Sequence, residues 1–438
     1  MHMLGPIPSL LALAAILIAA SVASFSIAAR AGGSSSPAKA EFTKMPAGLK
    51  ERSLPERLLV AYPGWSACGP PVEQAILNGV NVVMWSFGDL RRGPDGAASV
   101  VVHPDAACIR RVADAHSGVI HMLSFGGWNS PHPDDSIPPE AYYEAWKRWN
   151  QSPEHARSDG SPLFDGFDWD LEGNDDPSSP TNAFSVETLD IMGRMSVLAK
   201  GDGYMVSLAP AESYLDPRSG ASFSRSLLLD DAAWEEEFRQ EKGPAYVRPV
   251  FGYHGRNCWA YLLAQYGWAA FDFVSVQFYE SYTHFGYDVQ VAGLSVSEAI
   301  QRASQPYFDG WEVDFSADDD PRVSRLGRRR IVVPPRRFVF GLIALHGDPL
   351  QHLPAARPPY PKVFTLLPAG EPGNAVAEAF EALRRGGRGP RGAMYWCVAE
   401  EVDSSAPFYM SSGLAAVLKL TGNASFPQDG SHFATDEL

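Results

Sequence analysis

The sequence predicts an α/β protein built as one (β/α)8 TIM barrel. Apolar, strand-like runs alternate with helix-like stretches along most of the chain, and eight such strands can be counted. Several of them are continuous apolar runs rather than alternating ones, as is typical of parallel strands that are covered on both faces. Eight strand and helix alternations favour a closed barrel, and a doubly wound open sheet is the alternative.

Each expected element has its own segment. The strands are expected at Leu58 to Tyr62, Val80 to Phe87, Val119 to Phe125, Gly166 to Glu172, Tyr204 to Ala209, Phe273 to Tyr279, Phe338 to Leu345 and Ala393 to Val398. The clearest helices between them are expected at Pro71 to Asn78, Asp105 to Ala115, Pro139 to Trp149, Val186 to Lys200, Ser295 to Ser304 and Ala375 to Arg385. The connections after the fifth and sixth strands are too long for a simple helix, so we expect elaborated loops there.

Composition limits the classes of partner. The chain has 438 residues, of which 45% are hydrophobic and 20% charged, as in a globular protein with a large core. With 36 basic and 51 acidic residues, its formal net charge is −15. Nucleic acid is excluded as a partner, because its binding depends on neutralising phosphates with a basic surface. A neutral substrate fits this negative net charge better than a nucleic acid does.

The two ends of the chain point to the secretory pathway. An apolar run from Ser9 to Ala20 predicts a signal peptide or an uncleaved signal anchor, and no other membrane contact is expected. The last four residues, Thr435 to Leu438, resemble an endoplasmic reticulum retention signal, so the protein is expected to be secreted or kept in that lumen.

The four cysteines allow three pairings, and one or two bridges or small buried thiols are the alternatives. The expected division is residues 1–30 as leader, 31–55 as linker, 56–422 as barrel and 423–438 as tail.

The most informative segment is the fourth strand. Side chains alternate along a strand, so Asp168, Asp170 and Glu172 share one face, about 6.6 Å apart, at ~3.3 Å per residue. Three buried carboxylates are costly unless they are protonated, hydrogen-bonded or in use. Glu172 lies nearest the C-terminal end, where barrel substrates arrive, and its acidic neighbours favour the protonated form. The residues therefore predict a general acid, with an exposed acidic strand or a metal site as alternatives.

These residues carry a family resemblance. The run Asp165 to Glu172 resembles the DGxDxDxE signature of glycoside hydrolase family 18, the chitinase family. Ser124 to Gly127 is similar to its SxGG element, and Gln277 to Tyr279 is similar to its QxY element. Trp396 is similar to the tryptophan that forms the floor of the −1 sugar site. The resemblance covers roughly residues 58–420.

The resemblance implies a retaining, substrate-assisted mechanism that needs no metal or organic cofactor. Glu172 would be the general acid and base, Asp170 would orient the acetamido group, and Asp168 would support Asp170 electrostatically. Tyr279 would bind the acetamido carbonyl. Gln277, Trp396 and Glu280 are the other expected substrate contacts, with Glu280 standing where the family usually has Asn; Asp165, Gly166, Ser124, Gly126 and Gly127 are expected to be structural.

We therefore expect a monomeric hydrolase of β-1,4-linked N-acetylglucosamine oligosaccharides or polysaccharides, most simply a chitinase. An endo-β-N-acetylglucosaminidase acting on the N-glycan core and a non-catalytic carbohydrate-binding relative are the alternatives. Outside the motifs, Glu212 is expected to be a surface acid, with a sugar contact as the alternative. The arginines at 328–330, with Arg336 and Arg337, are expected to form a solvated loop.

Overall fold

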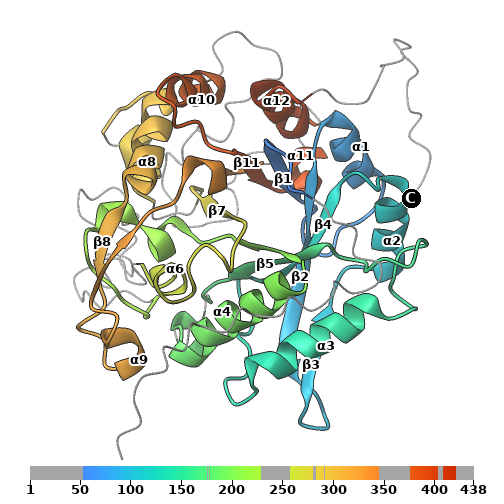
Figure 1. Cartoon of the computed structure of the whole chain (residues 1–438). Coiled ribbons are helices and arrows are strands. Elements are labelled where there is room, and N and C mark those ends of the chain that lie inside the picture. Colours follow the sequence, from blue (N-terminus) through green and yellow to red (C-terminus); the bar gives the residue numbers. More distant parts are fainter. Residues whose placement is uncertain are drawn as a thin grey trace, which may run out of the picture. The chain divides into compact units, whose positions relative to one another are not determined.

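Eight parallel strands close into a ring (Figure 1). The computed structural model describes residues 53–174, 176, 178–227, 257–279, 283–290, 292–344, 375–402 and 408–420. Within these ranges the order around the ring is β1-β11-β10-β7-β6-β5-β4-β2, and β1 pairs with both β11 and β2. Because no edge is left open, the prediction of a (β/α)8 barrel is confirmed and the open sheet is excluded.

All eight predicted strands are present, with ends that differ by a few residues. The predicted strand at Val80 to Phe87 is too short at its C-terminal end, because β2 continues to Arg92. Leu345, the last residue of the seventh predicted strand, lies outside the described residues. The barrel strands are β1 Leu58–Tyr62, β2 Val82–Arg92, β4 Ile120–Gly127, β5 Gly166–Leu171, β6 Met205–Leu208, β7 Phe273–Gln277, β10 Phe338–Ile343 and β11 Gly392–Trp396.

Three further strands lie beside the ring. β3 (Ala98–Val102) pairs antiparallel with the extension of β2, and β8 (Trp311–Asp314) pairs with β9 (Arg328–Ile331) in a separate hairpin. The prediction of a loop at residues 328–330 is therefore wrong. These arginines are exposed, as expected, but their backbone is paired with β8, and Arg328 contacts Asp314 at 2.9 Å.

The six predicted helices are confirmed, and local sequence explains where several of them begin. Asp105 accepts a hydrogen bond from the Ala107 N–H at 2.9 Å, and Ser295 forms a capping box with Glu298. The helices are α1 Pro70–Asn78, α2 Ala106–Ala115, α3 Pro139–Gln151, α4 Val186–Gly201, α6 Ala260–Tyr266, α7 His284–Gln290, α8 Val296–Asp309, α9 Pro321–Ser324, α10 Ala375–Arg385, α11 Val398–Val402 and α12 Tyr409–Leu418.

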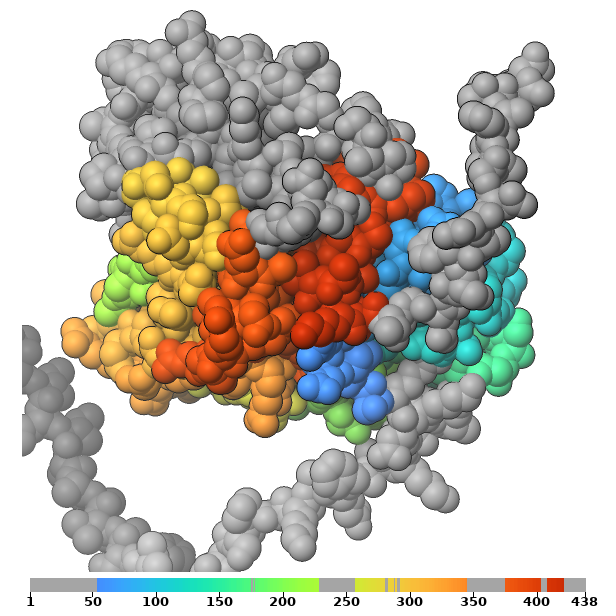
Figure 2. Space-filling model, turned by 90° about the horizontal axis from the view of Figure 1, so that it is seen from above, coloured from blue at the N-terminus to red at the C-terminus, as the bar shows by residue number. Residues whose placement is uncertain are grey.

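The core has two layers. Side chains that point outward from the strands pack against the helices and include Phe167, Trp169 and Leu171 of β5. A smaller cluster fills the barrel and includes Leu58, Met122 and Met394. Figure 2 shows the first described segments lying beside the C-terminal ones, as the pairing of β1 with β11 requires.

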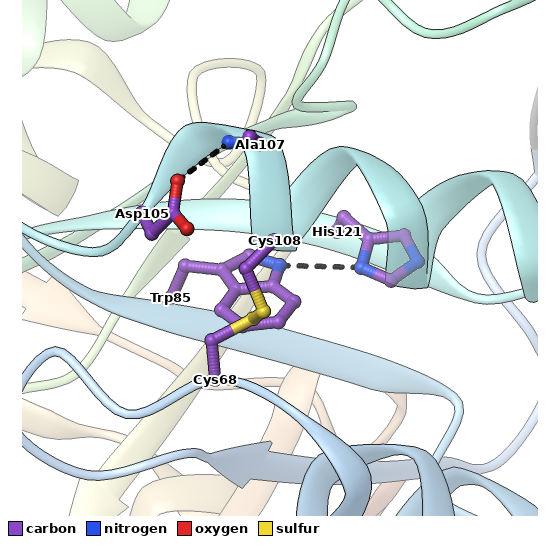
Figure 3. The surroundings of a disulfide bond; sticks show 6 residues. All are labelled: Cys68, Trp85, Asp105, Ala107, Cys108 and His121. Atoms are coloured by element: carbon purple, nitrogen blue, oxygen red, sulfur yellow. Dashed lines mark hydrogen bonds between the residues drawn. A yellow bond between two sulfur atoms is a disulfide. The ribbon is translucent and has the colours of Figure 1, made fainter.

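One disulfide joins Cys68, in the connection after β1, to Cys108 on α2 (Figure 3). This answers the pairing that the sequence left open. Cys258 and Cys397 are buried thiols that are not disulfide-bonded. Among the described residues, no helix is both long and apolar enough to cross a bilayer.

Candidate active site

The three acids of β5 lie along the inner side of the barrel. Phe167, Trp169 and Leu171 pack in the outer layer, so the alternate side chains of the strand point inward. Asp168 is fully buried, Asp170 is 4% exposed, and Glu172 lies just beyond the last residue of the strand and is partly exposed. The row therefore leads from the closed interior of the barrel to its open C-terminal end.

Asp168 is held by three hydroxyl groups from three other strands. Its carboxylate accepts hydrogen bonds from Tyr62 at 2.7 Å, Ser124 at 3.0 Å and Ser207 at 2.5 Å. Register explains two of these contacts, since Ser124 and Ser207 lie directly opposite Asp168 on β4 and β6. Burial raises the pKa of Asp168 to about 6, although the three hydroxyl donors favour its ionised form.

Asp170 connects the interior of the row to Glu172. Its Oδ1 accepts a hydrogen bond from Gln277 Nε2 at 2.7 Å, and the same amide group donates to the Ala209 carbonyl at 2.8 Å. A side-chain hydrogen bond joins Asp170 to Glu172. The structure thus brings Asp170, Glu172 and Gln277 together.

Burial also controls the protonation of this pair. It raises the pKa of Glu172 to about 7, while the hydrogen bonds from Asp170 and Gln277 oppose the rise. Burial and the charge of Glu172 raise the pKa of Asp170 well above its usual range. The pair consequently holds a proton near neutral pH, as a general acid and its partner require.

Glycines allow β4 and β5 to approach their neighbours. A Cβ on Gly126 would lie 2.5 Å from the Asp170 carbonyl, and one on Gly127 would lie 2.6 Å from the Phe87 ring. Both residues have a positive φ, of 115° and 87°. Gly166 begins β5, where a Cβ would lie 1.9 Å from the Met205 carbonyl.

Asp165 lies at the other end of β5. Its carboxylate pairs with Arg157 at 2.8 Å and accepts the His121 backbone N–H at 2.9 Å. It precedes the first residue of the strand, whereas Glu172 follows the last one. Asp165 therefore links β5 to β4 and to the chain before it, at a distance from the acid row.

Aromatic rings lie beside the acids at the C-terminal ends of β1 and β11 and in the middle of β2. The ring of Trp396 is stacked on that of Phe87, with centroids 5.7 Å apart and an angle of 13°. Tyr62, which donates to Asp168, has its ring centroid 5.7 Å from that of Trp396. Tyr279 packs against the same interior cluster. A sugar can stack on the apolar faces of these aromatic side chains.

Two exposed tryptophans at this end of the barrel were not among the predicted site residues. Trp65 is 60% exposed and contacts both Phe87 and Trp396 edge-on. Trp128 is 39% exposed, and its ring would lie 3.6 Å from a Cβ on Gly173. Trp128 directly follows β4, and Trp65 lies in the connection that leaves β1; this position after a barrel strand is the sequence signal that could have identified them.

Two further acids named from the sequence are Glu280 and Glu212. Glu280 lies outside the described residues. The prediction that Glu212 is a surface acid is wrong, because its side chain is 2% exposed. A short helical turn after β6 directs it inward, where it accepts the Phe285 N–H at 3.3 Å, and burial raises its pKa to about 7. Nearby, His284 and Asp216 form a pair at 3.1 Å.

Within the described ranges, no group of three or more His, Cys, Asp or Glu residues is arranged to hold a metal ion. The donors that surround Asp168 and Asp170 are hydroxyl and amide groups of the protein itself. The arrangement is suited to proton transfer.

No protein-family model matches the chain, and no curated protein matches it. Similar solved structures include the C-terminal domain of Legionella pneumophila ChiA, with 14% identity and a TM-score of 0.46 over 81% of this chain and 96% of that one. The catalytic domain of a family GH18 chitinase from the fern Peteris ryukyuensis has 15% identity and a TM-score of 0.45, over 83% and 99%. A Group IV chitinase of Ostrinia furnacalis in complex with allosamidin has 12% identity and a TM-score of 0.43, over 83% and 99%.

Proposed function

We propose that the protein hydrolyses β-1,4 linkages of N-acetylglucosamine in chitin or chito-oligosaccharides. The observation that carries the proposal is the inward row of β5, in which Glu172 ends the row and shares a hydrogen bond with Asp170. A carboxyl group with a pKa of about 7 is protonated often enough at neutral pH to act as an acid, and it still ionises readily afterwards. The matching signature residues and the aromatic rings beside the row support the same reaction.

The proposed mechanism is substrate-assisted. Glu172 protonates the glycosidic oxygen while the acetamido oxygen of the substrate attacks its own anomeric carbon, and the glycosidic bond breaks to release the leaving sugar as an alcohol. Asp170 accepts the acetamido N–H and stabilises the positively charged intermediate, and buried Asp168 supports it. Tyr279 donates to the acetamido oxygen, and Trp396 stacks on the sugar. Glu172, now ionised, then takes a proton from the water that attacks the anomeric carbon. The bond to the acetamido oxygen breaks in this second displacement, so that the configuration is retained.

We propose further that the protein acts as a monomer in the secretory pathway, either secreted or in the endoplasmic reticulum lumen. The Cys68–Cys108 bridge supports an oxidising compartment. Such a location would equally suit an endo-β-N-acetylglucosaminidase, so the substrate must be tested directly.

The test is digestion of chitotetraose to chitohexaose beside a high-mannose glycoprotein. A chitinase cleaves the oligosaccharides, an endo-β-N-acetylglucosaminidase releases the glycan, and a non-catalytic binding protein cleaves neither. Glu172→Gln should lower turnover by about a hundredfold or more while ligand affinity is kept. Glu401→Gln is the matched control, because this buried acid bonds Tyr395 and Ser411 outside the barrel interior. Unchanged turnover in Glu172→Gln would refute the proposal.

A further inference from the structure

The backbone of Glu172 is not held by the sheet. On the β4 side the last pair of the ladder is Gly127 with Leu171, and on the β6 side it is Leu208 with Trp169. Glu172 follows both pairs; its side chain bonds Asp170 and Gln277, whereas its backbone carbonyl is contacted from a segment outside the strands. This matters because a general acid must lie within hydrogen-bonding distance of the atom that it protonates.

Neighbouring segments supply the missing contacts. His132, in the connection between β4 and α3, has its Nε2 3.0 Å from the Glu172 carbonyl oxygen. The backbone N–H of Asn129 donates to the Gly173 carbonyl at 3.0 Å, and Asn182 Oδ1 accepts the Asn174 N–H at 2.9 Å. Among these contacts, only that of His132 is made to Glu172 itself, and it is made by a side chain.

The environment of His132 fixes both its ring and its tautomer. A carbonyl oxygen only accepts hydrogen bonds, so Nε2 must carry the proton. Burial lowers the pKa of His132 to about 4, against the opposing field of Asp135, so the imidazole is neutral at working pH. Its ring is stacked on the fully buried Phe184, with centroids 4.7 Å apart and an angle of 25°. The donor is therefore fixed in direction.

We propose that His132 is a positioning residue for Glu172: its Nε2–H holds the Glu172 carbonyl and thereby directs the acid toward the substrate. This inference rests on the proposed function of Glu172. His132 does not exchange a proton with the substrate; it acts through the backbone of the residue that does.

Two substitutions separate the hydrogen bond from the ring. His132→Phe keeps an aromatic ring against Phe184 but removes the donor, whereas His132→Gln keeps an amide donor at similar reach. His155→Phe is the matched control, because His155 likewise stacks on an aromatic ring, that of Trp149, and has its Nδ1 2.9 Å from the Trp149 carbonyl oxygen. It lies in the connection that leads into the N-terminal end of β5, away from Glu172.

For His132→Phe we expect kcat on chitotetraose to fall on the order of tenfold to a hundredfold, as when a catalytic group is displaced by about 1 Å. KM should change less than twofold, and the basic limb of the pH profile should shift because the contacts of Glu172 with Asp170 and Gln277 change. His132→Gln should recover most of kcat, and His155→Phe should keep it. A purely structural histidine would lower thermal stability without changing kcat of the folded protein.

The outcomes distinguish this inference from the proposed function. If Glu172→Gln is inactive while folded His132→Phe keeps the wild-type kcat and pH profile, the role of His132 is overturned and the proposed function stands. If His132→Gln is as impaired as His132→Phe, the donor is not what matters and the inference also fails. If Glu172→Gln is fully active, the proposed function itself fails. If His132→Phe does not fold, the kcat of folded His132→Gln is compared with that of wild type. A strongly lowered kcat in His132→Gln then overturns the inference.

Discussion

The properties of individual residues in the acid row follow from burial. Asp168 receives three hydroxyl donors and Asp170 one amide donor, whereas Glu172 is stabilised mainly through Asp170 and Gln277. The pKa is raised to about 6 for Asp168, to about 7 for Glu172 and well above its usual range for Asp170, so the Asp170–Glu172 pair holds a proton more readily than Asp168 does. In the proposed mechanism this difference separates the supporting carboxylate from the pair that supplies the proton.

The pH dependence of catalysis should report this proton. Because the proposed mechanism requires a protonated Glu172 for its first step and the pKa of this residue is about 7, kcat/KM should fall above pH ~7, approaching tenfold for each pH unit. The measurement is initial rates on chitotetraose from pH 4 to pH 10. The residual activity of Glu172→Gln should lack this limb. A wild-type profile that stays level up to pH 9 would contradict the assignment.

Glu172 should also make stability depend on pH. Its pKa rises from 4.5 to about 7 on folding, so between these values the unfolded chain loses the proton while the folded chain keeps it. The free energy of unfolding should therefore decrease as pH rises through this window, by up to about 3 kcal/mol at ~1.4 kcal/mol per pKa unit. Urea unfolding of wild type and Glu172→Gln should agree near pH 4 and diverge by pH 8, with the variant more stable. Parallel curves would contradict the raised pKa.

At the residue scale, the sequence could predict which side chains of β5 face inward, because alternation depends only on the strand. It could not predict the burial of Glu212, which depends on a turn after β6 and on the backbone of Phe285. Nor could it predict the contacts of Trp65 with Phe87 and Trp396, which lie on β2 and β11.

Among the elements, β5 is the one whose placement determines the site. It enters the barrel at Gly166, where the backbone of β6 comes so close that only a hydrogen atom fits. Asp165 is bonded to β4 at the same point. The position of the whole acid row therefore depends on a close approach at the opposite end of the strand.

Gly166→Ala should consequently destabilise the protein by about 3 kcal/mol, at the upper end of overpacking substitutions, because the Met205 carbonyl belongs to a paired strand and cannot move aside easily. Gly118→Ala is the control, since a Cβ there meets nothing within 4 Å. Thermal unfolding of the two variants gives the comparison. Equal melting temperatures would show that β5 and β6 tolerate a wider spacing.

Strands that belong to the barrel could be predicted, whereas the added ones could not. Apolar runs identify barrel strands because both of their faces are covered. β9, with its three exposed arginines, has no such pattern, and it is a strand because β8 pairs with it and Asp314 contacts Arg328. A strand of four residues depends on its partner more than on its own composition.

At the scale of the whole molecule, the number of strands favoured a closed barrel, because eight parallel strands with helices between them form a barrel whose interior is filled by side chains. The pairing of the cysteines was not available from the sequence, since it depends on which segments the ring brings together. Closure of the first strand–helix units places Cys68 beside α2, close to Trp85 and His121 (Figure 3).

This bridge should contribute to global stability and remain a single bridge. It closes a separation of 40 residues, for which restriction of the unfolded chain gives about 4 kcal/mol. Cys108→Ala should lower the free energy of unfolding by a comparable amount, whereas Cys258→Ala, which removes a buried thiol outside the bridge, should act only through packing.

In native protein the thiols of Cys258 and Cys397 should resist alkylation, and burial also raises the pKa of Cys397 to about 11. Mass spectrometry after alkylation under denaturing, non-reducing conditions should find two modified thiols; four would show that the protein is made without the bridge and would count against an oxidising compartment.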